Sequence, residues 1–180
     1  MKKSALLLSL LITLALPAKG QFENYIRISG DAGIVANTER DKSFGMGGTL
    51  SWMTSDNIIS FKENNFITLS VKGFNNPYGD GKFISSILNG ENDGFNYILP
   101  MLGYRITQKG IKDGAFAEMR LGPLYGSNYS GFAMSPIVGY AFNYFDISLY
   151  CDIVFSTRMS AIGKQNFAEP GISFAYSFGF

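Results

Sequence analysis

The feature that most constrains the fold is a two-residue alternation of apolar and polar side chains, which recurs in eight segments of the chain. These segments lie near residues 25–35, 44–53, 65–73, 96–106, 115–125, 133–144, 145–155 and 166–180. Alternation with a period of two indicates β-strands with one apolar face. Each segment has about ten residues, a length that suits a tilted strand crossing a bilayer. The pattern predicts eight strands of membrane-spanning length.

The charged side chains of these segments lie on the face opposite the apolar one. In the last segment, Ile172, Phe174 and Tyr176 share the apolar face, while Glu169 falls on the other. The predicted interior charged cluster consists of Arg27, Asp31, Lys72, Arg105, Glu118, Arg120, Asp152 and Glu169. Its four bases and four acids can neutralise one another, as burial of charge requires. Two interpretations stay open: a lumen filled by salt bridges, and a path for ions or protons.

The composition of the polar face indicates which face points inward. A water-soluble carrier would turn its apolar face inward and cover its outside with Lys and Glu. The polar face here is mostly Gly, Ser, Ala and Thr, which suits the narrow interior of an eight-stranded barrel. The broad apolar face suits lipid, where only helices and closed barrels satisfy every backbone group. We therefore predict an all-β fold, an eight-stranded antiparallel up-and-down transmembrane β-barrel, with Cys151 facing lipid.

The first twenty residues have the pattern of an export signal. Lys2 and Lys3 precede a short apolar run, 5–16, and small residues stand at the −3 and −1 positions before Gln21. Twelve apolar residues are too few to span a hydrocarbon core of about 30 Å. We therefore expect residues 1–20 to be a cleaved signal peptide and residues 21–180 to form one outer-membrane barrel domain.

Composition excludes several classes of function. Removing residues 1–20 takes away three lysines and no acid, so the formal charge falls from +1 to −2. No basic run remains, and nucleic-acid binding is therefore not expected. The chain has no histidine and one cysteine, which removes the commonest general base and the commonest metal ligands. Ser70 and Lys72 stand two apart without any further catalytic signature, so we expect no catalytic residue, no cofactor and no metal.

A longer repeat places tyrosines at equivalent positions of alternate strands. Tyr104, Tyr140 and Tyr176 are spaced by 36 residues twice over, and Pro100 and Pro136 precede the first two at the same offset. One up-and-down hairpin with its connections occupies this length. We expect the three tyrosines to lie at headgroup depth as part of an aromatic girdle; the alternative is a chance repeat of common barrel residues.

An export signal, eight alternating segments and a terminal Phe180 resemble the small outer-membrane β-barrels of the OmpA/OmpX type. The run Pro136-Ile137-Val138-Gly139-Tyr140 also resembles the broad outer membrane protein beta-barrel group. The likeness covers almost all of residues 21–180, and its motifs are compositional. It implies that the barrel-assembly machinery recognises Phe180 during insertion. That group shares no catalytic residue, so the resemblance implies none here.

The connections divide between the two ends of the predicted barrel. Those near 36–43, 74–95, 126–132 and 156–165 would face outward, and those near 54–64, 107–114 and 143–146 would face the periplasm. The longest, 74–95, contains Phe83, Ile84, Ile87 and Leu88, whose spacing puts them on one side of a short helix. They are candidates for contact with a partner, for a plug, or simply for packing over the barrel mouth. The acids of this connection match no calcium-binding spacing.

Together these observations predict a non-catalytic protein of the cell outer membrane in a Gram-negative envelope. It would be structural or would interact through its extracellular loops, alone or as an accessory subunit of a larger outer-membrane complex. The alternative is a narrow pore or transport protein for small solutes. The expected partners are outer-membrane lipid and the barrel-assembly machinery. Another outer-membrane protein is a further candidate partner.

Overall fold

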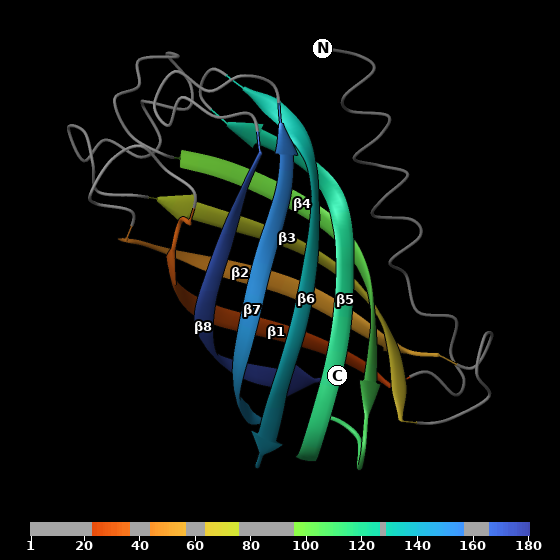
Figure 1. Ribbon diagram of the computed structural model, residues 1–180. Helices are drawn as coiled ribbons and strands as arrows, with labels where there is room; N and C mark the ends of the chain where they lie inside the picture. The colour runs from red at the N-terminus through yellow and green to blue at the C-terminus, as the bar shows by residue number, and fades with distance from the viewer. Residues whose placement is uncertain (1–22, 37–43, 57–63, 76–95, 127–128, 157–165) are drawn as a thin grey trace, which may run out of the picture.

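The computed structural model describes residues 23–36, 44–56, 64–75, 96–126, 129–156 and 166–180. These residues form one closed antiparallel barrel in which every strand pairs with its neighbours in sequence and β1 pairs with β8 (Figure 1). The strands are β1 (Asn24–Ile34), β2 (Phe44–Ser55), β3 (Asn65–Asn75), β4 (Asn96–Thr107), β5 (Asp113–Gly126), β6 (Ser130–Phe142), β7 (Phe145–Ser156) and β8 (Asn166–Gly179). The predicted fold class, an eight-stranded up-and-down barrel, is confirmed.

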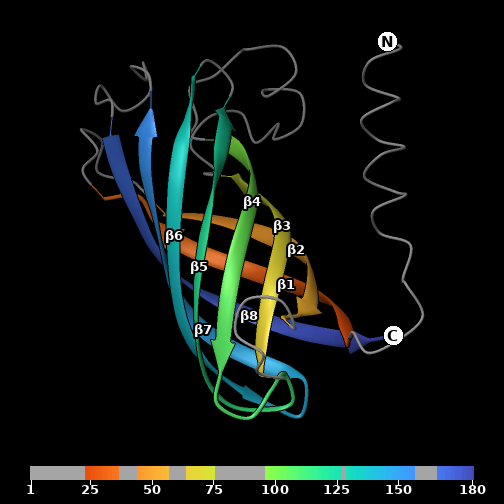
Figure 2. The ribbon, with the colours of Figure 1, turned by 90° about the vertical axis from the view of Figure 1, so that its right-hand side faces the viewer.

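The register of the ladders defines the two ends of the barrel. Asn24 stands opposite Thr54, and Tyr25 stands opposite Gly179, so β1 begins where β2 and β8 end. We call this the turn end, because the connections 108–112 and 143–144 also lie there, and we call the opposite end the loop end. Figures 1 and 2 show the strands strongly tilted, so that those of the front wall cross those of the back wall.

Alternate residues of every strand point in opposite directions, as the period of two predicts. Along β1, Ile26 and Ile28 are exposed on the outside, while Arg27 and Ser29 are buried inside. Along β8, Ile172 and Phe174 are exposed, while Glu169 and Ser173 are buried. The charged face therefore points into the barrel and the apolar face points out, as predicted. Within the described ranges there is no helix long and apolar enough to cross a membrane.

The hairpin between β6 and β7 has a two-residue turn whose backbone is left-handed. Asn143 has φ 50° and Tyr144 has φ 70°, the conformation that matches the twist of paired strands in a tight hairpin. We expected the sixth strand at 133–144, but it starts earlier, at Ser130, and ends earlier, at Phe142. It starts earlier because Ser130 and Gly131 continue the ladder with β5. From the sequence we expect a loop at these positions, because serine and glycine are common in loops.

Close strand contact explains one glycine. Pro100 and Pro123 occupy opposed positions of β4 and β5, where ladder pairs are missing between Ile98 and Leu102. Proline has no N–H to donate to a ladder. Next to this opening, a Cβ on Gly122 would lie 1.9 Å from the carbonyl oxygen of Pro100. Only glycine allows the two backbones to approach so closely.

Candidate functional site

The structure places all eight residues of the predicted charged cluster inside the barrel. Each is at most 5% exposed, and Arg105, Asp152 and Glu169 are completely buried. A ninth charged side chain, Asp146, lies with them and is 3% exposed. The predicted balance of four bases and four acids is therefore wrong, because five acids of the described strands lie in the lumen. The sequence pattern puts Asp146 on the polar face of the seventh segment and also at the edge of a turn at 143–146, and the predicted cluster leaves it out; the turn ends at Tyr144, and Asp146 is the second residue of β7.

The nine charged side chains form three groups. The first, which we call the Arg27 cluster, consists of Arg27, Arg105, Glu118, Arg120 and Asp146. Arg27 holds the Asp146 carboxylate with two parallel hydrogen bonds, Nε to Oδ2 at 2.8 Å and Nη2 to Oδ1 at 2.7 Å. This fork-on-carboxylate geometry is the strong form of an ion pair.

The rest of the Arg27 cluster joins this pair to Glu118. Arg120 donates to both carboxylate oxygens of Glu118, at 2.6 and 3.0 Å, and Thr68 donates to it at 2.8 Å. Arg105 lies between the two acids, 3.9 Å from Glu118 and 3.7 Å from Asp146. Its guanidinium carbon is 3.4 Å from the centroid of the Phe116 ring. Three cations thus share two carboxylates and an aromatic face.

The second group, which we call the Lys72 cluster, consists of Lys72, Tyr97, Tyr150, Asp152 and Glu169. Lys72 Nζ donates to Asp152 at 2.6 Å and to Glu169 at 3.2 Å. It also lies 3.7 Å from the centroid of the Tyr150 ring. Tyr150 donates to Glu169 at 2.8 Å, and the Tyr97 hydroxyl contacts both acids. Because its ammonium is bound by two carboxylates, Lys72 is not a free base that could activate Ser70.

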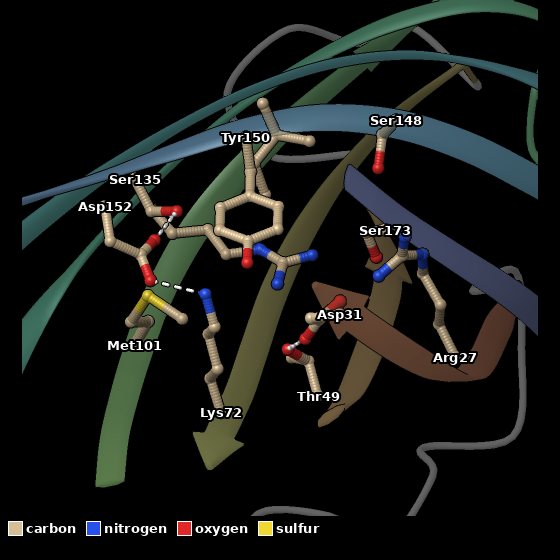
Figure 3. A pocket seen from close by; sticks show the side chains of 12 residues that line it. Arg27, Asp31, Thr49, Lys72, Met101, Ser135, Ser148, Tyr150, Asp152 and Ser173 are labelled. Atoms are coloured by element: carbon tan, nitrogen blue, oxygen red, sulfur yellow. Dashed lines mark hydrogen bonds and ion pairs between the residues drawn. The ribbon is translucent and has the colours of Figure 1, made fainter. Parts of the chain in front are cut away.

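Asp31 forms the third group with two hydroxyls. Thr49 donates to its Oδ2 at 2.5 Å, and Ser29 donates to its Oδ1 at 3.0 Å. Figure 3 shows Asp31 and Thr49 on one side of a small cavity, with Lys72, Asp152 and Ser135 on the other. Hydroxyl donors and the positive charge of Lys72 therefore stabilise this carboxylate in the lumen.

Apolar layers close the barrel above and below the charged groups. At the loop end the layer consists of Val35, Phe74, Tyr97, Leu99, Met101, Leu124, Tyr129, Ala133, Val154 and Phe167. At the turn end, Tyr25, Met53, Phe66 and Ile111 form a smaller layer. The sequence predicts an inner face of mostly small residues, but the inward-pointing side chains of β4, Tyr97, Leu99 and Met101, are large. Both faces of β4 are apolar, so the alternation that identifies the inner face is missing there.

The cavity among the charged groups is small. It has a volume of about 10 Å³ and is lined by residues that include Arg27, Asp31, Lys72, Tyr150 and Asp152. That volume is room for about one water molecule. Among the described residues, the apolar layers at both ends lie between this cavity and the two mouths of the barrel.

The outer surface carries aromatic side chains at both ends. At the turn end, Phe142, Phe145, Tyr176 and Phe178 form a chain of ring contacts, with neighbouring centroids 4.6 to 6.2 Å apart. At the loop end, Phe44, Tyr125, Phe132 and Phe155 are about half exposed. The three repeated tyrosines, Tyr104, Tyr140 and Tyr176, lie near the turn ends of β4, β6 and β8 on the outer face.

Polar contacts tie two of these tyrosines to the rim of the barrel. Tyr104 donates to Asp56 at 2.6 Å and accepts from Asn65 at 3.1 Å. Tyr140 donates to Asp113 at 3.4 Å. Their rings thus lie on the apolar surface while their hydroxyls reach the polar edge, which is how tyrosine behaves at a membrane interface.

The remaining predicted residues lie at the C-terminal end of the barrel or outside the residues that the structure describes. The loop candidates Phe83, Ile84, Ile87 and Leu88, and the signal segment 1–20, fall outside the described residues. Phe180 is 69% exposed, and its backbone N–H donates to the carbonyl of Asn24 at 3.0 Å, which joins the two ends of the barrel seam. In the portion of the chain that the structure describes, no group of three or more His, Cys, Asp or Glu side chains could hold a metal ion.

Sequence reasoning missed several polar residues of the lumen. Tyr97 and Tyr150 bind the acids of the Lys72 cluster, and Ser135 donates to Asp152 at 2.6 Å. Tyr150 and Asp146 share the polar parity of their segment with Asp152, so that signal was present. Tyr97 had none, because its neighbours on both faces of β4 are apolar.

A closed eight-stranded up-and-down barrel with an apolar outside and a charged inside is the architecture of the small transmembrane β-barrels of the outer membrane. Comparison with solved structures finds similarity to the crystal structure of Ail, the attachment invasion locus protein of Yersinia pestis, in complex with the heparin analogue sucrose octasulfate. The sequence identity is 11%, the TM-score is 0.46, and the match covers 88% of this chain and 100% of that chain. No protein-family model and no curated protein matches the sequence.

Proposed function

We propose that the protein is a sealed, non-catalytic barrel of the cell outer membrane that acts through the segments at its loop end. It serves as a structural or interaction protein, or as an accessory subunit of a larger outer-membrane complex. The observation that carries this proposal is the filling of the lumen: two apolar layers enclose ion-paired side chains, and the cavity among these side chains holds about one water molecule. Because the lumen of such a barrel is filled with side chains, its contacts with partners are made by its outer surfaces.

The spacing of the aromatic side chains supports insertion in a membrane. Phe145 and Phe155 mark the two ends of the outer face of β7, ten residues apart. At a rise of about 3.4 Å per residue they are about 34 Å apart along the strand. A tilt of about 40° reduces this to about 26 Å along the barrel axis, close to the apolar band of about 25 Å in such barrels.

The connections support a role for the loop end. At the turn end, two of the three connections are short, 108–112 and 143–144, whereas the connection between β3 and β4 at the loop end spans 76–95. In barrels of this class the longer connections face the outside of the cell. Segment 76–95 is therefore the first candidate for contact with a partner, and Phe180 is the candidate signal for the barrel-assembly machinery.

The test against the alternative, a narrow pore, is single-channel recording of the purified protein in planar bilayers. We expect no stable conductance steps. Ser148 lines the small cavity and is buried, so Ser148→Leu would close the remaining space. Stable steps in the natural protein that disappear in Ser148→Leu would overturn the proposal in favour of transport.

The interaction role needs a separate experiment. Segment 76–95 is replaced by a short Gly/Ser connection, and the proteins that remain bound after gentle detergent extraction are quantified by mass spectrometry. We expect a stoichiometric companion to be lost while the barrel still folds. A matched replacement of 108–112 at the turn end is the control. If both replacements leave the set of bound proteins unchanged, the loop end does not carry the function.

A further inference from the structure

The Lys72 cluster brings two acids together at a completely buried position. Asp152 on β7 and Glu169 on β8 are directly opposed in the strand register, and neither is exposed. Lys72 donates to both, so one ammonium group faces two carboxyl groups. Their four oxygens must share the available hydrogen-bond donors, since a buried oxygen without a donor is costly.

The Tyr97 hydroxyl makes more contacts with carboxyl oxygens than it has protons to donate. Ser135 donates to Asp152 Oδ1, Lys72 donates to Asp152 Oδ2, and Glu169 Oε1 receives Lys72 and Tyr150. The Tyr97 hydroxyl lies in hydrogen-bond contact with both Asp152 Oδ2, at 2.9 Å, and Glu169 Oε2. A tyrosine hydroxyl has a single proton and donates only once. Its second contact is attractive only if the other carboxyl group brings a proton of its own.

The charge of the lumen leads to the same count. The three charged groups of the lumen contain four cations and five anions, while Asp56, a further buried acid, lies at the turn end and accepts from Tyr104. The groups that face Glu169 are Lys72 from β3, Tyr97 from β4, Tyr129 from the connection between β5 and β6, Tyr150 and Asp152 from β7, and, beyond Lys72, Asp31 from β1. The sequence of β2 contains no ionisable residue, and the buried charges of β5, Glu118 and Arg120, belong to the Arg27 cluster. One added proton makes the charges of these three described groups balance.

We propose that Asp152 and Glu169 together bind one proton, carried on Oε2 of Glu169 at pH values where an ordinary glutamate is ionised. Glu169 then donates to the Tyr97 oxygen, and Tyr97 donates to Asp152 Oδ2. Asp152 keeps its hydrogen bonds from Lys72 and Ser135. In this arrangement a proton lies between the oxygens of both Tyr97 contacts, and the charge of the cluster falls from −1 to zero.

Proton binding couples the stability of the barrel to pH. In the unfolded chain, a glutamate releases its proton near pH 4.3. Above that pH the folded barrel holds one proton more than the unfolded chain, so stability falls as pH rises. The unfolding equilibrium constant should increase about tenfold per pH unit, up to the pH at which the folded barrel itself releases the proton.

Carbon-13 NMR of the full chain in detergent micelles, labelled at the glutamate carboxyl carbons, tests the proposal directly. At pH 6 the Glu169 resonance should stand at the position of a protonated acid, while the resonance of exposed Glu23 stands at that of an ionised one. Asp152→Asn leaves four cations and four anions, so Glu169 should then be ionised at pH 6. An ionised Glu169 in the natural protein at pH 6 overturns the proposal.

Unfolding measurements give an independent readout. Glu169→Gln has the shape of the protonated acid and removes the titrating group. Its unfolding constant should lack the tenfold rise per pH unit that the natural protein shows above pH 4.3. Parallel pH profiles for the two proteins would contradict the proposal. If Glu169→Gln does not fold, the NMR titration of the natural protein alone decides the question.

Discussion

The ion pair between Arg27 and Asp146 offers the sharpest test of how the lumen is stabilised. Both side chains are 2% exposed, and two hydrogen bonds of 2.7 and 2.8 Å join them. Arg27→Met removes the guanidinium and leaves Asp146 with only Arg105, at 3.7 Å. Removing one partner of a buried pair costs about 3–5 kcal/mol, because a buried charge remains without compensation. The unfolding constant should therefore rise by a factor of at least about a hundred.

The assay is urea unfolding in detergent or vesicles, followed by the fluorescence of Trp52, the one tryptophan of the chain. Arg27→Met combined with Asp146→Leu replaces the pair by apolar groups and should recover most of the loss, since such replacements are often close to neutral. The matched control is the exposed pair Lys109–Asp113, with side chains 62% and 50% exposed. Lys109→Met should cost less than about 1 kcal/mol. Equal costs for Arg27→Met and Lys109→Met would refute the argument.

The remaining predictions use the same unfolding assay. Gly122→Ala should cost about 1–3 kcal/mol, because its Cβ would overlap the backbone of β4. The control, Gly30→Ala, should change stability by less than about 0.5 kcal/mol, because its Cβ would meet nothing within 4 Å. Similar costs for the two variants would contradict the close approach of β4 and β5. Asn143→Val should cost about 1–2 kcal/mol, because a branched residue is strained at φ 50°, and Asn143→Gly should cost much less; a reversed order would exclude the left-handed turn. In vesicles, Leu149→Arg should cost about 2–4 kcal/mol and Ile34→Arg about 0–1 kcal/mol, because the first lies midway along its strand and the second at the loop end. A cost for Leu149→Arg as low as that for Ile34→Arg would show that the middle of β7 does not face hydrocarbon.

The fold follows from the sequence because strand periodicity separates two environments at every second residue. In β1 and β8 each inward charge is flanked by outward apolar residues, so the pattern gives both the strand and the direction of its faces. In β4 the inward Tyr97, Leu99 and Met101 are as apolar as their outward neighbours. There the sequence predicts a strand but does not say which residues fill the lumen.

The pairing within the lumen could not be predicted, because it depends on register between strands distant in sequence. Arg27 meets Asp146 across 119 positions of the chain, and Lys72 meets Glu169 across 97. The sequence indicates that opposite charges share one face, but the choice of partner depends on the tilt of the strands across the barrel. Asp146 has the polar parity of its segment, but its position beside the predicted turn at 143–146 kept it out of the predicted cluster.

The central claim is that the apolar face of the barrel, not the charged one, meets lipid, and the single cysteine of the chain allows a direct measurement. Cys151 lies on the outer face of β7, partly exposed, and its neighbour Asp152 is completely buried inside. A nitroxide spin label is attached to Cys151 in protein inserted in vesicles, and its collisions with oxygen and with a water-soluble nickel chelate are compared. Because oxygen concentrates in hydrocarbon, we predict far more frequent collisions with oxygen. A label that collides more often with the nickel chelate would place this face in water and contradict the account.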